Sequence, residues 1–92
     1  MAKYTILYHR KFVKDYEKLS NNDRLLVDEV IEKLANGEIL DQKYKDHKLK
    51  GNLKDFRECH VKPDLLLMYE IQENILHLNL MRVGSHSDLF KK

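Results

Sequence analysis

One apolar run, LLLMYEI at residues 65–71, constrains the fold more than any other part of the chain. Side chains of a β-strand point alternately to the two faces of its sheet. One face of this strand would carry Leu65, Leu67 and Tyr69, and the other would carry Leu66 and Met68. Because both faces are apolar, each needs cover from another part of the chain. The run therefore predicts a strand in the centre of a sheet.

Two further segments have the composition of strands and flank the central run. They are FRECHV at residues 56–61 and ILHLNLMRV at residues 75–83. The KPD turn, in which Pro63 fixes φ, and the QEN turn, in which Asn74 tolerates a left-handed backbone, connect the three segments. Links this short favour antiparallel neighbours, so we expect a meander. The last strand has a leucine face, made of Leu76, Leu78 and Leu80, that can pack against helices.

The N-terminal half predicts one strand, at residues 3–8, followed by two helices. The first helix is expected at residues 10–19, where Phe12, Tyr16 and Leu19 recur at helical spacing. The second helix begins near Ser20, where either Ser20 or an adjacent asparagine can cap it, and ends at Gly37. Its apolar stripe consists of Leu26, Val27, Val30, Ile31 and Leu34. The short link between the helices favours an antiparallel hairpin.

These elements predict an α+β fold in two layers, in the order β-α-α-β-β-β. The helix hairpin would pack on a mainly antiparallel four-stranded sheet. Residues 1–92 are expected to form a single domain, because a chain of this length has no room for a second core. Residues 38–53 follow neither the helical nor the strand period, so we expect a long loop there, and such loops are often functional.

Positive charge is concentrated in one part of the chain. Residues 43–62 carry seven lysines and arginines against three acids, a net charge of +4, whereas the segments before and after each carry −1. Such a segment can bind phosphates by releasing their counterions, although a solvated lysine loop would have the same composition. Cys59 is the single cysteine, which excludes an internal disulfide and favours the cytoplasm. Neither a signal peptide nor a membrane helix is expected.

Four groups could take part in chemistry, namely His47, His60, Asp64 and His86. In a meander, the end of the last strand lies beside the start of the middle strand, which would bring Asp64 and the GSHS turn together. Histidine can act as a general base and, once protonated, as an acid. RNA cleavage needs both roles, together with cations around the phosphate. Histidines at strand ends are also ordinary polar surface, and at this point both interpretations stay open.

A metal site is a weaker alternative for the same residues. Cys59 and His60 are adjacent in a predicted strand, so they point to opposite faces. The chain has no CxxC or HxxxH pair that would begin a zinc site. We therefore expect no metal or other cofactor, and we interpret Cys59 as a small buried apolar residue. His9 and His77 are interpreted as surface residues.

Three motifs, in the order YKDHKLKG, FRECHVKPDLLLMYEI and RVGSHSDLF, resemble the YafQ branch of the RelE/ParE toxin superfamily. The resemblance covers almost the whole chain. It implies a RelE-like fold and a toxin of a bacterial type II toxin–antitoxin pair. It also implies a ribosome-dependent, metal-independent endoribonuclease that cleaves mRNA by attack of the 2′-hydroxyl on the adjacent phosphate.

The resemblance also implies a set of functional residues. The catalytic set falls on His47, His60, Asp64, His86 and Phe90. His60 and His86 would be the main proton-transfer pair, with acid and base unassigned. Asp64 would orient a histidine or the 2′-hydroxyl, His47 would assist from the loop, and Phe90 would stack on a base. The RNA-binding set consists of Arg57, Lys48, Lys50, Lys54 and Arg82. Family members can have an aromatic residue where this chain has Leu65.

The family further implies a partner, an acidic antitoxin that folds as it binds. The basic segment at residues 43–62 would be its landing surface, and the toxin would be a monomer when free and part of a hetero-oligomer when bound. ParE-type relatives share the fold and inhibit gyrase without cleaving RNA. A non-nucleolytic inhibitor of that kind, or a simple RNA-binding module, is therefore the alternative function.

Overall fold

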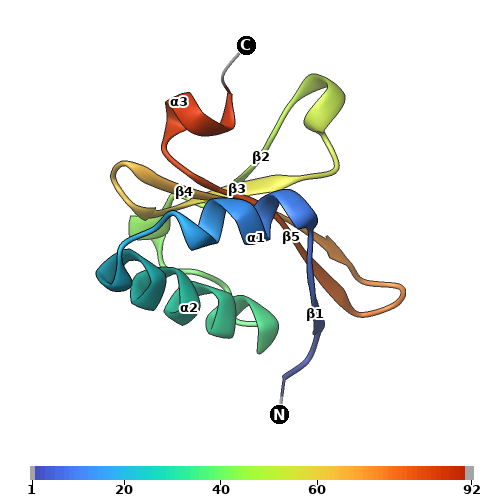
Figure 1. Ribbon diagram of the computed structural model, residues 1–92. Helices are drawn as coiled ribbons and strands as arrows, with labels where there is room; N and C mark the ends of the chain where they lie inside the picture. The colour runs from blue at the N-terminus through green and yellow to red at the C-terminus, as the bar shows by residue number, and fades with distance from the viewer. Residues whose placement is uncertain (1, 91–92) are drawn as a thin grey trace.

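The computed structural model describes residues 2–90 and folds them around a five-stranded sheet (Figure 1). The strands are β1 (Thr5–Tyr8), β2 (His47–Lys48), β3 (Arg57–Lys62), β4 (Leu65–Gln72) and β5 (His77–Gly84). They lie in the order β1-β5-β4-β3-β2. β1 is parallel to β5, and the other pairings are antiparallel. The predicted meander is confirmed, and β4 is the central strand.

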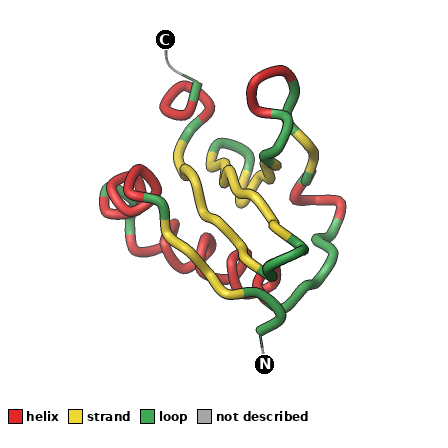
Figure 2. The backbone as a smooth tube through the Cα atoms, turned by 90° about the vertical axis from the view of Figure 1, so that its right-hand side faces the viewer, coloured by secondary structure: helices red, strands yellow, loops and turns green. Residues whose placement is uncertain are grey.

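Two helices, α1 (Arg10–Glu17) and α2 (Asn21–Ala35), cover one face of this sheet and run in roughly opposite directions (Figures 1 and 2). The Ser20 hydroxyl caps α2 by accepting a hydrogen bond of 3.1 Å from the backbone N–H of Asp23. Gly37 follows the end of α2 with a φ of 81°, a left-handed conformation that glycine adopts without steric cost. Both ends of α2 therefore agree with the prediction.

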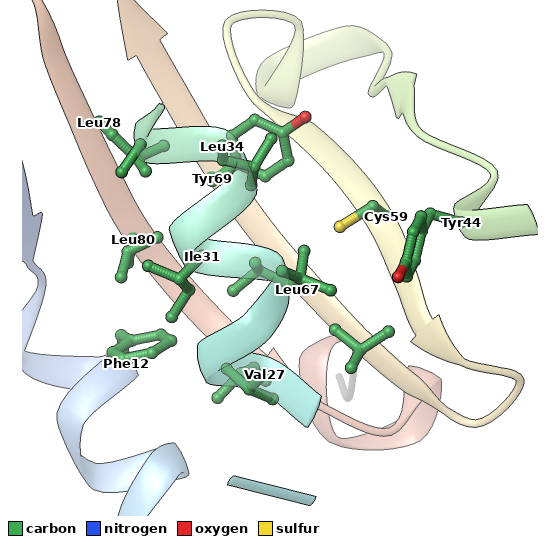
Figure 3. Close-up of a cluster of buried hydrophobic side chains, with 14 of the residues drawn as sticks. Phe12, Val27, Ile31, Leu34, Tyr44, Cys59, Leu67, Tyr69, Leu78 and Leu80 are labelled. Carbon is green, nitrogen blue, oxygen red and sulfur yellow. The ribbon is translucent and has the colours of Figure 1, made fainter. Parts of the chain in front are cut away.

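The main hydrophobic core lies between the two helices and the sheet (Figure 3). Val27 and Ile31 of α2 face Leu67 and Leu80 of the strands across this core. Each such side chain stabilises the fold by about 1.5–3 kcal/mol when it is fully buried. Leu26 is 38% exposed and lies outside the core, so it does not belong to the apolar stripe that was predicted for α2.

The expected four-stranded sheet and the expected loop at residues 38–53 both need correction. Within that stretch the chain forms two 3₁₀ helices, η1 (Gln42–Tyr44) and η2 (Gly51–Leu53), and the short strand β2 between them. β2 adds a fifth strand because its two residues pair with the first two residues of β3. Two residues are too few to show a period, so the sequence pattern did not reveal them.

The turn between β4 and β5 also differs from the prediction. The residue that adopts a left-handed backbone is Leu76, with a φ of 52°, and not Asn74. Leu76 is 44% exposed and precedes β5, whereas Leu78 and Leu80 are fully buried. The leucine face of β5 therefore begins at Leu78.

The far face, meaning the face of the sheet opposite α1 and α2, has two segments standing on it (Figure 1). One is α3 (His86–Leu89), a short helix where the sequence predicted only a turn. The other is the connection from β2 to β3, which contains η2. None of the helices formed by residues 2–90 is long and apolar enough to cross a bilayer.

Candidate functional site

One row of paired residues crosses the sheet from β2 to β5, and its members on β2 and β3 lie on the far face. In order, it consists of His47, Glu58, Met68 and Arg82. Glu58 belongs to this face because the next residue, Cys59, points into the helix-side core. The row therefore connects a histidine from the basic segment to a carboxylate on the central part of the sheet.

A second row lies next to the first, toward the β3–β4 turn. It consists of His60, Leu66 and Gly84. Strands are spaced by about 4.8 Å, so Gly84 is about 10 Å from His60 across the far face. His86 follows two residues later at the start of α3. The predicted proximity of the end of the last strand to the start of the middle strand is confirmed.

His47 is held through both nitrogens of its ring. Its Nδ1 lies 2.7 Å from the carbonyl oxygen of Lys45, and its Nε2 lies 3.5 Å from Oε1 of Glu58. Both partner atoms are oxygens that can accept a hydrogen bond. The His47 side chain is half exposed, which leaves part of the ring accessible from solvent.

Glu58 is the functional candidate that sequence reasoning missed. It is only 5% exposed, and within residues 2–90 its buried Oε2 atom has no hydrogen-bond partner. A buried carboxylate with one unsatisfied oxygen is costly for the fold, so such groups often serve a function. The signal in the sequence was a charged residue two positions before His60, on the same face of an otherwise buried strand.

His86 and Phe90 form a contact at α3. The Ser85 hydroxyl caps this helix at the Asp88 N–H, and the Asp88 carboxylate accepts a hydrogen bond from the Ser85 N–H in return. This capping box fixes the start of the helix, where His86 is exposed. The rings of His86 and Phe90 lie 4.9 Å apart between centroids, with their planes tilted by 41°.

Asp64 and Leu65 lie at the β3–β4 turn with opposite exposure. Asp64 is exposed, and in the part of the chain that the structure describes no hydrogen bond or ion pair joins it to His60 or His86. Leu65 is 3% exposed and packs in the helix-side core, so it is not available to stack on a base. The structure therefore joins His47 to Glu58 and His86 to Phe90, but it shows no contact that joins these groups to Asp64.

Two of the predicted RNA-binding residues already have carboxylate partners. Nη2 of Arg57 lies 3.1 Å from Oδ2 of Asp46, and Nε of Arg82 lies 2.7 Å from Oδ2 of Asp15. The Asp15 hydrogen bonds raise the pKa of the Arg82 guanidinium. Burial lowers the pKa of the Arg57 guanidinium, but the hydrogen bonds and negative charge of Asp46, together with Tyr69, outweigh this effect, so its pKa is raised overall.

The predicted lysines, in contrast, are exposed. They are Lys48, Lys50 and Lys54. Among residues 2–90, no carboxylate forms an ion pair with any of the three. These three lysines lie at the end of β2 and in the connection from β2 to β3.

Comparison with known proteins assigns the chain to a family. The family described as "Bacterial toxin of type II toxin-antitoxin system, YafQ" matches residues 4–91. The chain belongs to the YafQ family. The match covers far more than half of the chain and includes all the residues discussed above.

Three relatives illustrate the similarity to other YafQ family members. The mRNA interferase toxin YafQ of Escherichia coli K12 is 43% identical over 47 residues, which is 51% of this chain and about half (49%) of the length of that protein. A metal-bound toxin from Helicobacter pylori is 53% identical, covers 95% of this chain and 99% of its own, and has a TM-score of 0.85. YafQ in the E. coli DinJ–YafQ toxin–antitoxin complex is 30% identical, covers 96% of this chain and 98% of its own, and has a TM-score of 0.84.

No group of three or more His, Cys, Asp and Glu side chains within residues 2–90 is placed to hold a metal ion.

We expect the thiol of Cys59 to resist alkylation in the folded protein. Burial raises its pKa to about 12, and only the thiolate reacts. Because an unfolded thiol has a pKa of about 8.5, the stability that depends on this group is lost as the pH rises from that value toward 12. Mass spectrometry after iodoacetamide treatment at pH 8 should find no adduct in the native protein and one adduct in guanidinium chloride. Rapid labelling of the native protein would contradict the burial of β3.

Proposed function

We propose that this protein is the toxin of a type II toxin–antitoxin pair and that it acts as an endoribonuclease on mRNA. The reaction would depend on the ribosome, need no metal, and begin with attack of the 2′-hydroxyl on the adjacent phosphate. Family membership supports the reaction class. The observation that carries the proposal is the strand pairing, which puts His47 opposite Glu58 and puts His60 in the same row as Gly84, two residues before His86.

His60 and His86 form the proton-transfer pair in this proposal. One takes the proton of the 2′-hydroxyl and the other protonates the leaving 5′-oxygen. Asp64 orients the 2′-hydroxyl or a histidine from the β3–β4 turn. Phe90, which contacts the His86 ring, stacks on a base and holds the nucleotide against that histidine.

His47 serves as a positive charge beside the phosphate in this proposal. Its two ring nitrogens face oxygen atoms of the chain, those of the Lys45 carbonyl and the Glu58 carboxylate. The Glu58 carboxylate stabilises that charge from the buried side. Positive groups fixed near the phosphate stabilise the charge that develops in the transition state.

Phosphate binding rests mainly on three lysines, which are Lys48 at the end of β2 and Lys50 and Lys54 in the connection from β2 to β3. Their exposure leaves them free to replace the counterions of RNA. Arg57 and Arg82 contribute less, because each is already paired with a carboxylate of the chain. Since the site requires the ribosome, we also propose a cytoplasmic location.

Expression of the wild-type chain in a bacterial host tests this function. We expect growth arrest together with cleavage of mRNA within translated regions, while the supercoiling of plasmid DNA is unchanged. Growth arrest with intact mRNA and relaxed plasmid DNA would contradict the nuclease and favour a gyrase-type inhibitor. Cleavage of mRNA by purified protein without ribosomes would contradict the proposed ribosome dependence.

The partner in our proposal is an acidic antitoxin that folds on binding and forms a hetero-oligomer with the toxin, which is a monomer when free. A relative in this family has been crystallised in a toxin–antitoxin complex. A cavity of about 530 Å³ lies between α2, η1 and β3, and His60 is among its lining residues. Its lining combines apolar side chains, such as Tyr44 and Val61, with Lys43 and Lys45 at its edge. An acidic amphipathic segment fits this composition and would cover the basic segment at residues 43–62.

We expect the double variant Lys48→Glu/Lys50→Glu to bind the antitoxin at least tenfold more weakly, and to show a smaller dependence of affinity on salt. The reason is that the variant removes two positive charges and adds two negative ones on the landing surface. Isothermal titration at two salt concentrations measures both effects. The control variant is Lys14→Glu/Lys18→Glu, which makes the same charge change around α1. Equal affinities for the wild type and the Lys48/Lys50 variant would show that the antitoxin lands elsewhere.

A further inference from the structure

The strand that carries His47 is too short to hold itself in place. β2 has two residues, and its ladder consists of the pairs His47 with Glu58 and Lys48 with Arg57. Isolated pairings of this length are not stable in water. Lys45, just before it, has a left-handed φ of 49°, so the chain turns sharply immediately before Asp46. Additional contacts are needed to fix the position of His47.

Asp46 supplies those contacts on the helix side of the sheet. Its carboxylate accepts a hydrogen bond of 2.5 Å from the Tyr69 hydroxyl and is bound by Nη2 of Arg57 at 3.1 Å. A second contact from Arg57, through Nε at 3.3 Å, makes the ion pair nearly bidentate. Asp46 is therefore attached to β3 and to β4 at the same time.

Tyr69 is a rigid support for this attachment. It is 1% exposed, and Figure 3 shows its ring within the core, with the hydroxyl directed away from Leu67 and Leu80. Burial, followed by the hydrogen bond to Asp46, raises the pKa of the hydroxyl, so it stays a donor well above neutral pH. The ring cannot move without disturbing the central strand, and its hydroxyl is therefore a fixed point for the Asp46 carboxylate.

Successive residues of an extended chain point to opposite faces. Since Asp46 is tied to the helix side, the next residue, His47, must point to the far face, where it meets Glu58. We propose that Asp46, held by Tyr69 and Arg57, is a positioning residue that orients His47 for the reaction. This inference rests on the proposed function, because it assigns a purpose to the placement of His47.

The Tyr69→Phe variant tests the inference by removing one hydroxyl and leaving the buried ring. We expect kcat for mRNA cleavage to fall about tenfold with little change in KM, because small displacements of a catalytic group cost one to two powers of ten in rate. In NMR spectra, the ring resonances of His47 should shift, and those of His86 should not. The matched control is Tyr16→Phe, which removes a similar tyrosine–aspartate hydrogen bond, that of 2.7 Å to Asp28, from the α1–α2 pair.

A double-mutant cycle with His47→Ala separates positioning from a general structural role. In the His47→Ala background, Tyr69→Phe should cause no further loss of activity, because there is no ring left to position. An equal loss in both backgrounds would overturn the inference. Unchanged His47 resonances in Tyr69→Phe would also overturn it. The NMR result does not depend on activity, so a failure of the proposed nuclease function would remain distinguishable from a failure of this inference.

Discussion

Replacing His86 with alanine is expected to lower kcat for mRNA cleavage by about 10²- to 10⁴-fold, the usual contribution of a general acid or base. The side chain is exposed at the start of α3, and the capping box that holds this helix uses Ser85 and Asp88. The substitution should therefore leave the fold intact and remove only the proton transfer. Primer extension on mRNA in a reconstituted translation system gives the rate, and thermal denaturation checks the fold.

The control for this prediction is His77→Ala. His77 lies at the other end of β5, five residues before Arg82, and pairs with Thr5 and Gln72 in the ladder. At about 3.3 Å per residue, it is roughly 17 Å from the rows that contain the site. Its replacement should leave cleavage unchanged. Full activity of His86→Ala, with normal folding, would remove His86 from the catalytic pair.

Replacing Glu58 with glutamine is expected to lower the activity of the protein and to raise its stability. The substitution keeps the shape of the side chain and removes the negative charge beside His47, so we expect kcat to fall about 100-fold. The free energy of unfolding should rise by about 1 kcal/mol, because a buried carboxylate with one unsatisfied oxygen is no longer present. His47 is half exposed, so its own charge stays hydrated in the variant. Activity and urea denaturation are measured on the same protein.

The matched control is Glu70→Gln on the neighbouring strand β4. The Glu70 carboxylate accepts a hydrogen bond of 3.1 Å from the Asn79 amide and is only partly buried. This variant should change neither quantity appreciably. A Glu58→Gln variant that is fully active, or one that is less stable than the wild type, would contradict the assignment of Glu58 as a buried functional charge.

The main architecture was predictable because its elements are long and regular. The second helix shows a clear period, a Ser20 cap and a Gly37 end, and β4 is apolar on both faces. The elements that were missed are short. β2 has two residues, which is a single strand repeat, and α3 has four, which is about one helical turn, so neither segment shows a recurring pattern. Their positions depend on contacts with distant segments.

The histidines of the candidate site could be predicted from the sequence, whereas its ion pairs could not. His47, His60 and His86 are recognisable because histidine is uncommon and their order is distinctive. The carboxylate partners of Arg57 and Arg82 could not be recognised in this way, because Asp46 is 11 residues from Arg57 and Asp15 is 67 residues from Arg82. No local pattern connects residues that meet only when the sheet is assembled. For the same reason, the unsatisfied oxygen of Glu58 was not visible in the sequence.

The parallel pairing of β1 with β5 has a consequence for synthesis on the ribosome. Residues 5–8, which leave the exit tunnel early, form their ladder only with residues 77–80. Chains in which such distant segments must meet fold slowly and late. Nascent chains that end before β5 lack the partner of their first strand, and they also lack His86. The same order of events delays both the closure of the sheet and the assembly of the site, so incomplete translation products should be harmless to the cell that makes them.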